Sequence, residues 1–401
     1  MKPPFKDALP ILERLEQEGF QAYFVGGAVR DSLLNRPIDD VDIATSATPK
    51  QVQELFQKTI PIGIEHGTIL VRYNNQSFEV TTFRTESDYQ DFRHPETVEF
   101  VKDIELDLSR RDFTMNAIAM DRNGKCIDPY LGQTHIREKR IETVRDADER
   151  FCEDPLRMMR ALRFVSQIGF QLGLSAEEAI IRNQHLLRNI AVERIAAEME
   201  KLWKGSYIHQ ALSILIKTEI GRSLPIFKDH DSLIEACLNR ISTPFHSLPE
   251  AITCMHLLHQ EVSIDEWCKL WKLSKSVKNR CHQLTRVYHY YQHQGLKPET
   301  LYQLTPDMIP EFVHLVLILD AHSSLSIGEV EHDYKLLPIK NRDELAINGH
   351  EILALLPDEK PGPWLRTFIE RIEKQVINGS LPNDKQQIKE WVKKWNRQEK
   401  S

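Results

Sequence analysis

The sequence lacks three features that would assign it to a familiar class: a long apolar run, paired cysteines and internal repeats. No apolar stretch approaches the length of a transmembrane helix, and the N-terminus MKPPFKDALP does not have the pattern of a secretory signal. No repeat or low-complexity segment is present. The cysteines contain no C-x-x-C pair and no zinc-like grouping, so we expect reduced thiols in a cytoplasmic protein that does not contact a membrane.

An excess of positive charge is also absent. The formal net charge is −7, so no global basic field attracts nucleic acid, and any RNA binding must use local patches. With 401 residues, of which 41% are hydrophobic, the chain is long enough for more than one domain.

The most informative stretch covers residues 22–45, AYFVGGAVRDSLLNRPIDDVDIAT. Ala22–Val25 is typical of a short buried strand, and Gly26-Gly27 allows a sharp turn and a close approach to a ligand, because no Cβ is in the way. Ala28–Asn35 is predicted to be a helix whose free N–H groups point back at the turn and suit a phosphate. Arg30 can add a charge-assisted contact to the same phosphate.

Two aspartates follow on a predicted strand, Ile38–Thr45. Residues two apart on a strand share a face, so Asp40 and Asp42 should project together. Paired carboxylates beside a phosphate site suit Mg²⁺. An isolated D-x-D is more often a pair of surface aspartates, but here it follows a glycine pair and an arginine in strand–turn–helix–strand order. The stretch resembles the signature of the polymerase-β-like nucleotidyltransferase superfamily.

Further elements are predicted around this stretch. We expect helices over Phe5–Gly19 and Pro49–Lys58, strands over Thr68–Tyr73, Ser77–Phe83, Thr97–Val101 and Ala117–Asp121, and a hairpin at Asn123-Gly124. Residues 84–96 are polar and aperiodic, which favours a mobile loop over the site. Glu79 is either a solvated strand residue or a third carboxylate of the metal site. From about residue 148 every periodic segment is helical.

A second stretch, EDPLRMMRALRF (153–164), carries Asp154, Arg157, Arg160 and Arg163 at a spacing of three. Asp154 before Pro155 is typical of a helix N-cap, but a cap does not explain the arginines. Cytosine and adenine each present an amino donor beside a ring acceptor, which Asp154 and Arg157 could match. Uracil and guanine present the reverse order. Polar complementarity of this kind rejects wrong partners by about 10⁴–10⁵.

The order GGAVRD, DDVDIAT, RRDFTMNA and EDPLRMMRALRF resembles the class II tRNA nucleotidyltransferases, the CCA-adding enzymes. VERIAAEMEK (192–201) is similar to the family's helix-supporting motif, and the resemblance is weaker beyond residue 205. It implies an α+β protein with an N-terminal nucleotidyltransferase α/β head (1–148) followed by an all-helical neck (149–206), body (207–300) and tail (301–401), the tail binding tRNA.

The resemblance also implies residue roles. By that likeness Gly27, Arg30 and Arg111 contact the nucleotide, Asp40 and Asp42 are catalytic and bind Mg²⁺, Asp154 and Arg157 read the base, and Arg160 and Arg163 support the nucleotide. Asp128 and Gly132 match a hinge motif or form a simple turn. The implied substrates are CTP, ATP and the 3′ end and acceptor region of tRNA. Whether the protein forms a homodimer is left open.

Related activities are the alternatives. Poly(A) polymerases of this class carry a basic signature after the catalytic strands, and IPIGIEHGTILV (60–71) has none. CC-only adding enzymes lack part of the polar loop, whereas this chain keeps Asp91–Pro95. A non-catalytic RNA-binding protein would be expected to lose Asp40 or Asp42. The lysine-rich end, Lys385–Lys400 with Trp391 and Trp395, either touches RNA or forms a solvated amphipathic helix.

Overall fold

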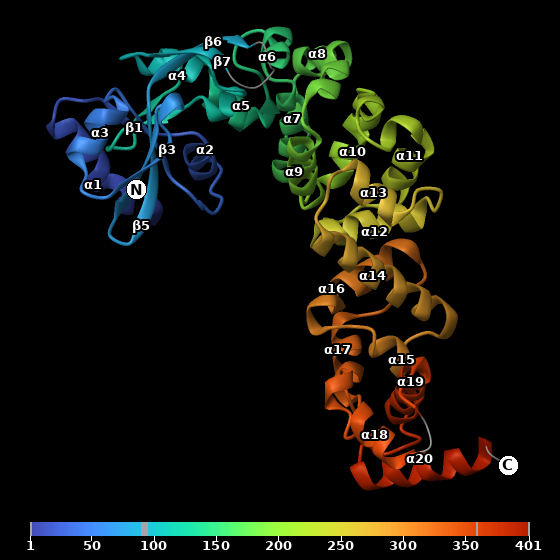
Figure 1. Cartoon of the computed structure of the whole chain (residues 1–401). Coiled ribbons are helices and arrows are strands. Elements are labelled where there is room, and N and C mark those ends of the chain that lie inside the picture. Colours follow the sequence, from blue (N-terminus) through green and yellow to red (C-terminus); the bar gives the residue numbers. More distant parts are fainter. Residues whose placement is uncertain (1, 90–94, 358–359, 400–401) are drawn as a thin grey trace. The chain divides into compact units, whose positions relative to one another are not determined.

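The computed structural model describes residues 2–89, 95–357 and 360–399, without the side chains of 87–89, 95–97 and 395–399. The chain divides into two compact units, Met1–Leu238 with Ser242–Pro244, and Asn239–Ile241 with Phe245–Ser401. Among the described residues every strand ends by Leu172, so the expected order of an α/β head followed by a helical part is confirmed (Figure 1). The neck (149–206) is not all-helical as expected, because it contains the two-residue strand Gln171–Leu172. The boundaries at residues 148, 206 and 300 stay a prediction, since the two units form a coarser division.

The head is built on a seven-stranded sheet with the order β3-β4-β5-β2-β1-β8-β9. Its strands are β1 (Ala22–Val25), β2 (Asp42–Thr45), β3 (Thr59–Gly63), β4 (Thr68–Tyr73), β5 (Gln76–Thr82), β8 (Ala119–Met120) and β9 (Cys126–Ile127). β1 and β2 are antiparallel, and β2 and β5 are parallel. The functional strands therefore lie in the middle of the sheet, where neighbours on both sides hold them.

Helices cover this sheet and follow it along the chain. They are α1 (Pro3–Gln17), α2 (Gly27–Leu33), α3 (Pro49–Leu55), α4 (Ile104–Ser109) and α5 (Gly132–Glu138). α1 buries Phe5, Ile11 and Leu15 at helical spacing. α3 begins with a reciprocal capping box between Thr48 and Gln51. The expected helices form with ends shifted by no more than three residues.

Two expectations about the strands are wrong. β2 begins at Asp42 rather than Ile38, because Pro37 and the following aspartates have no strand partner. Residues 84–96 are not simply a loop: β6 (Arg84–Tyr89) and β7 (Pro95–Phe100) form an antiparallel hairpin (Figure 1). Residues 91–94, used above to separate CCA from CC addition, lie outside the described residues.

The helical part of the first unit begins with α6 (Ala147–Glu153) and α7 (Leu156–Ile168). α8 (Leu174–Asn183), α9 (Val192–Trp203), α10 (Ile208–Lys217) and most of α11 (Asp231–Arg240) follow. A two-residue parallel pair, β10 (Arg140–Ile141) with β11 (Gln171–Leu172), ties the end of α7 back to the head. α7 packs along α9 and α10. It buries Met158, Met159 and Leu162, which leaves its arginines beside the head.

The second unit consists of helices in its described part. They are α12 (Leu248–Leu258), α13 (Ile264–Leu270), α14 (Lys275–Gln294), α15 (Pro298–Leu301), α16 (Ile309–Leu319), α17 (Ile327–Leu336), α18 (Gly349–Leu355), α19 (Pro363–Ile377) and α20 (Lys385–Glu399). The expected terminal helix is present, and Trp391 packs on Phe368 of α19 with ring centroids 5.9 Å apart. That contact gives Trp391 a structural role. No helix in the ranges described is both long and apolar enough to cross a membrane.

Candidate functional site

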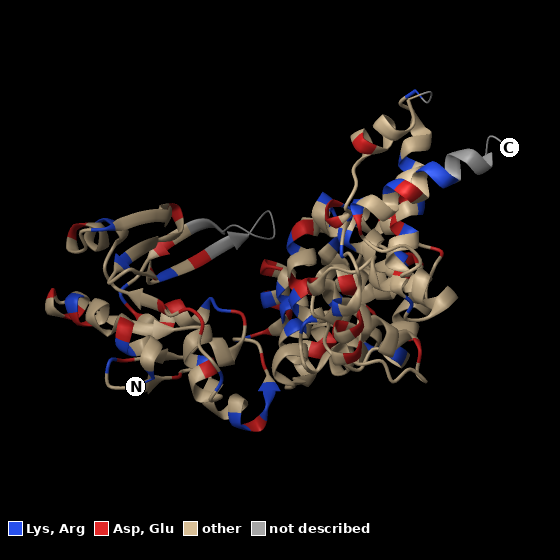
Figure 2. Cartoon of the chain, turned by 90° about the horizontal axis from the view of Figure 1, so that it is seen from below, with Lys and Arg blue, Asp and Glu red and all other residues tan. Residues whose placement is uncertain are grey.

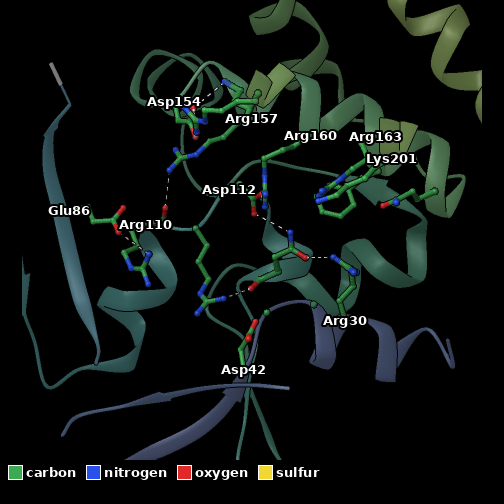
Figure 3. A pocket seen from close by; sticks show the side chains of 18 of the residues that line it. Arg30, Asp42, Glu86, Arg110, Asp112, Asp154, Arg157, Arg160, Arg163 and Lys201 are labelled. Atoms are coloured by element: carbon green, nitrogen blue, oxygen red, sulfur yellow. Dashed lines mark hydrogen bonds and ion pairs between the residues drawn. The ribbon is translucent and has the colours of Figure 1, made fainter. Parts of the chain in front are cut away.

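The first unit contains an open pocket of about 800 Å³ between the glycine turn, the β6 strand and helices α7 and α9 (Figure 3). Eight arginines and one lysine line it, against four carboxylates. The cations are Arg30, Arg84, Arg110, Arg111, Arg157, Arg160, Arg163, Arg194 and Lys201, and the carboxylates are Asp42, Glu86, Asp112 and Asp154. Figure 2 shows basic and acidic residues intermixed over the ribbon. The pocket is thus a local concentration of positive charge suited to an anionic ligand.

The glycine turn forms one wall. Gly26 has φ 71°, a left-handed conformation that glycine adopts without strain, and α2 starts directly after it at Gly27. A Cβ on Gly26 would lie 3.2 Å from Nη1 of Arg111 and 3.5 Å from Oδ2 of Asp42. The turn therefore packs closely between a cation and a carboxylate. Gly27 and Arg30 also line the pocket, as expected for a phosphate site.

The two aspartates of the D-x-D pair occupy different environments. Asp42 is partly buried and lines the pocket, whereas Asp40 is exposed, precedes the strand and is not among the lining residues. Val41 and Ile43 point into the core, as expected. Glu79 stands opposite Asp42 in the parallel β2–β5 pair, so the two side chains share a face.

Burial is the main cause that raises the pKa of Asp42 above its ordinary value. The charges of Glu79 and Asp40 raise it further, and Arg111 partly offsets them. The negative charges of Glu79 and Asp40 thus both act on Asp42, with one nearby arginine as the opposing charge. This surplus of negative charge on oxygen donors fits a hard divalent cation.

A chain of hydrogen bonds links the glycine turn to α7 (Figure 3). Arg30 donates to the side-chain oxygen of Asn116 at 2.7 Å, Asn116 donates to Asp112 at 3.0 Å, and Nε of Arg160 donates to the other Asp112 oxygen at 2.8 Å. Although burial alone would raise it, the pKa of Asp112 is held well below its ordinary value by Arg160 and Asn116. The chain orients Arg30 and Arg160 toward the pocket.

A second ionic group holds the tandem arginines. The buried Asp107 pairs with Arg110 at 2.9 Å and with Arg111 at 3.2 Å. These charges keep its pKa below the ordinary value despite burial. Arg110 also pairs with Glu86 of β6 at 3.0 Å, so the β6–β7 hairpin is tied to the residue next to Arg111. Arg111 is among the predicted nucleotide contacts that line the pocket.

Asp154 and Arg157 both line the pocket on the side that α6, α7 and α9 form (Figure 3). α7 begins at Leu156, one residue later than expected, but Oδ1 of Asp154 still accepts the Leu156 N–H at 3.1 Å. Asp154 also faces Arg194 of α9 at 3.3 Å. Arg157 donates to Glu153 at 2.7 Å and to the carbonyl oxygen of Arg110 at 3.2 Å. Asp154 is therefore both a cap and a pocket residue.

The other arginines of α7 gather around one aromatic ring. Phe164 has the guanidinium groups of Arg163, Arg30 and Arg160 at 4.3, 5.0 and 5.9 Å from its ring centroid. Arg163 pairs with Glu198 of α9 at 3.0 Å. Burial lowers the pKa of Arg163 to about 10, against the opposing effect of Glu198. The guanidinium stays charged at neutral pH and is held against the ring.

Sequence reasoning missed several pocket residues. Asp112 and Asn116 lie within the quoted RRDFTMNA motif, and Arg194 and Lys201 lie within VERIAAEMEK, so the motifs carried the signal although no role was assigned. Glu153, which holds Arg157 from outside the pocket lining, had no predicted role. In contrast, Asp128 accepts the N–H groups of Gly132 and Gln133 at 2.7 and 2.9 Å. This is the geometry of a helix cap at α5.

Comparisons with known proteins agree with this arrangement. Residues 22–142 match the model of the poly A polymerase head domain, residues 169–230 that of a probable RNA and SrmB-binding site of polymerase A, and residues 245–392 that of tRNA nucleotidyltransferase domain 2. The chain is 42% identical to the CCA-adding enzyme of Oceanobacillus iheyensis, with 97% of each chain covered. It is 43% identical to that of Anoxybacillus flavithermus, with 98% of each covered.

Solved structures extend the likeness. The crystal structure of the Bacillus stearothermophilus CCA-adding enzyme in complex with CTP superposes with a TM-score of 0.90 at 37% identity, covering 100% of this chain and 99% of that one. The Thermotoga maritima enzyme complexed with tRNA shares the fold, with a TM-score of 0.64 at 19% identity and 98% and 95% of the two chains covered. The chain belongs to the CCA-adding enzymes, a family of nucleotidyltransferases.

Proposed function

We propose that this protein adds and repairs the 3′-terminal CCA of tRNA without a nucleic-acid template, using CTP and ATP and releasing pyrophosphate. The observation that carries the proposal is the pocket, in which Asp42 and a pair of base-matching side chains, Asp154 and Arg157, border the same cationic cavity. The full-length relatives support the choice of substrates.

The metal site of the proposal consists of Asp40 and Asp42. Enzymes of this kind need a divalent cation, and we propose Mg²⁺, which prefers carboxylate and phosphate oxygens. When bound, it would lower the cost of forming the attacking alkoxide and of expelling the leaving oxygen. The raised pKa of Asp42 beside Glu79 and Asp40 is the physical reason to place a cation there. The register Asp42↔Glu79 supports Glu79 as a further ligand of the proposed site.

The triphosphate of the incoming nucleotide is assigned to the glycine turn and its arginines. Gly27, Arg30 and Arg111 line the pocket next to Asp42. Their orientation is held by Asn116 for Arg30 and by Asp107 for Arg111. Arg160 and Arg163 add positive charge from α7. Because these groups are oriented before the ligand arrives, they can stabilise developing phosphate charge with little reorganisation.

The base is assigned to Asp154 and Arg157. Asp154 accepts a hydrogen bond from the amino group of cytosine or adenine, and Arg157 donates to the adjacent ring nitrogen. The same pair meets uracil and guanine with acceptor against acceptor and donor against donor. One pair of side chains thus suits CTP and ATP together.

In the proposed reaction the 3′-hydroxyl of tRNA attacks the α-phosphate of the bound nucleotide. A phosphorus–oxygen bond forms to the hydroxyl oxygen, which loses its proton, and the bond to the pyrophosphate oxygen breaks. Arg30 and Arg111 hold the leaving pyrophosphate, and the reading pair keeps the base in place. The protein therefore acts mainly by positioning and charge stabilisation.

The tRNA body needs a second surface, which we propose lies in the tail. A cavity of about 670 Å³ in the second unit is lined by five basic side chains, Arg286, Lys340, Arg342, Arg366 and Lys374, and by three glutamates. Phosphates can bind such a local basic patch although the whole chain is acidic.

Incubation of the protein with tRNA lacking its 3′ CCA and with each labelled nucleotide in turn tests the function. CTP alone should add two residues, and CTP with ATP should complete CCA. Repeated addition of AMP would instead indicate a poly(A) polymerase, products that stop at CC a CC-only enzyme, and no incorporation a non-catalytic RNA-binding protein.

A further inference from the structure

Helix α9 contributes a row of charged side chains to the pocket. Arg194, Glu198 and Lys201 lie at spacings of four and three, so they share one face of the helix. Arg194 and Lys201 line the cavity, and Glu198 pairs with Arg163 of α7. Lys201 and Arg163 line the same cavity. α9 thus supplies charges that face the nucleotide-supporting side chains of α7.

Arg194 contacts the proposed base-reading pair, Asp154 and Arg157, through the Asp154 carboxylate. Nη2 of Arg194 lies 3.3 Å from Oδ2 and 3.5 Å from Oδ1 of Asp154. The side chains are 23% and 19% exposed, which limits screening by water. Since Oδ1 also accepts the Leu156 N–H, the carboxylate is held from two directions.

Arg157 has a separate partner of the opposite sign. Its Nη1 donates to Glu153 at 2.7 Å and to the carbonyl oxygen of Arg150 at 3.1 Å. Asp154 and Arg157 are three residues apart, a spacing at which unlike charges on a helix attract each other. Each therefore has a counter-ion that competes with direct pairing between the two.

We propose that Arg194 is a positioning residue for base discrimination: it holds the Asp154 carboxylate oriented and apart from Arg157, so that both remain available to the base. The inference rests on the proposed reading role of Asp154 and Arg157. Without Arg194 the carboxylate can rotate or turn to Arg157, and either change misaligns the acceptor that CTP and ATP require.

The test compares Arg194→Met, which removes the charge and keeps the apolar stem, with Arg194→Lys, which keeps a cation. Lys204→Met is the matched control, because Lys204 directly follows α9 and forms an exposed pair with Glu200 of that helix. Steady-state kcat and KM for CTP and ATP, UMP against CMP incorporation, and a melting curve are measured for each.

Arg194→Met should raise the KM for CTP and for ATP about tenfold, raise UTP use relative to CTP about tenfold, and change kcat less. Arg194→Lys should recover most of both effects, and Lys204→Met should behave as wild type. If Arg194→Met does not fold, Arg194→Gln makes the same test, because it removes the charge and keeps a hydrogen-bond donor.

Asp154→Ala in the same assay separates failure of the base-reading proposal for Asp154 and Arg157 from failure of the positioning role of Arg194. If Asp154→Ala relaxes selectivity, Arg194→Met should add little to it in the double variant, because both act through one carboxylate. If only Asp154→Ala relaxes selectivity, and Arg194→Met merely lowers the melting temperature, Arg194 is structural and the inference is wrong. If neither variant changes selectivity, the base-reading proposal itself fails.

Discussion

Asp42→Asn should make the metal-free protein more stable while it destroys nucleotidyl transfer. Asp42 is partly buried near Glu79 and Asp40, with Arg111 as the opposing charge, and its pKa is raised as a result. The folded state thus carries a cost for ionised Asp42 that the amide removes. Substitutions that relieve a cost of this kind commonly raise the free energy of unfolding by about 0.5–2 kcal/mol.

The sign of the pH dependence follows from the raised pKa. The cost is fully present above the folded-state pKa of Asp42 and disappears as the pH falls through it toward the unfolded value of about 3.9. Urea unfolding in the presence of a chelator should therefore show the variant more stable than wild type at pH 7, with a difference that shrinks in acid. Asp39→Asn, at an exposed neighbour, is the matched control and should show no gain.

Magnesium should make the wild type more stable than the Asp42→Asn variant. A cation that binds only the folded wild type stabilises it by about 2.7 kcal/mol at one hundred times its dissociation constant, whereas the variant should respond weakly. The variant should also lose the stabilisation that the metal gives to the transition state. A loss of about 4 kcal/mol corresponds to about a 10³-fold drop in the rate of transfer of both CMP and AMP. Equal stabilities with and without Mg²⁺, or retained incorporation above a few per cent of wild type, would contradict the metal assignment.

Three other variants test the remaining parts of the site. Asp154→Ala should raise UTP use relative to CTP by at least about tenfold; a variant that only loses about 1 kcal/mol of stability would leave Asp154 as a cap. Asp112→Asn should lower the free energy of unfolding by about 3–5 kcal/mol at pH 7, since it leaves Arg160 without its buried partner. Because the pKa of Asp112 is lowered, this difference should fade in denaturant titrations as the pH falls below about 4. Replacing Asp91–Pro95 with a short Gly/Ser linker should spare CC addition and remove the final A, as gel analysis of the products would show.

The glycine turn and its helix could be predicted because they depend on local chemistry. Gly26 adopts a backbone conformation that few other residues tolerate, and the helix begins directly after it. Capping at Thr48 and the Asn123-Gly124 hairpin are equally local. These features need only a few neighbouring residues, so a single sequence predicts them.

The β6–β7 hairpin could not be predicted from the same information. Its first strand, RTESDY, has no alternation of apolar and polar residues. The antiparallel partner strand and the pairs between Glu86 and Arg84 or Arg110 supply the stabilisation instead. Glu86 and Arg110 lie 24 positions apart in the sequence, and no spacing rule identifies their pairing.

The sequence predicted Asp154 and Arg157, which line the pocket, but not the residues that hold them in place. Asp154 and Arg157 carry opposite charges and must not neutralise each other if both are to meet a base. Glu153 at the end of α6 and Arg194 on α9 each give one of them a separate partner. A base that matches both side chains can then bind without first breaking a bond between them. Because Arg194 lies 40 positions from Asp154, this requirement follows from the packing of α9 beside α7, and only the three-dimensional structure identifies it.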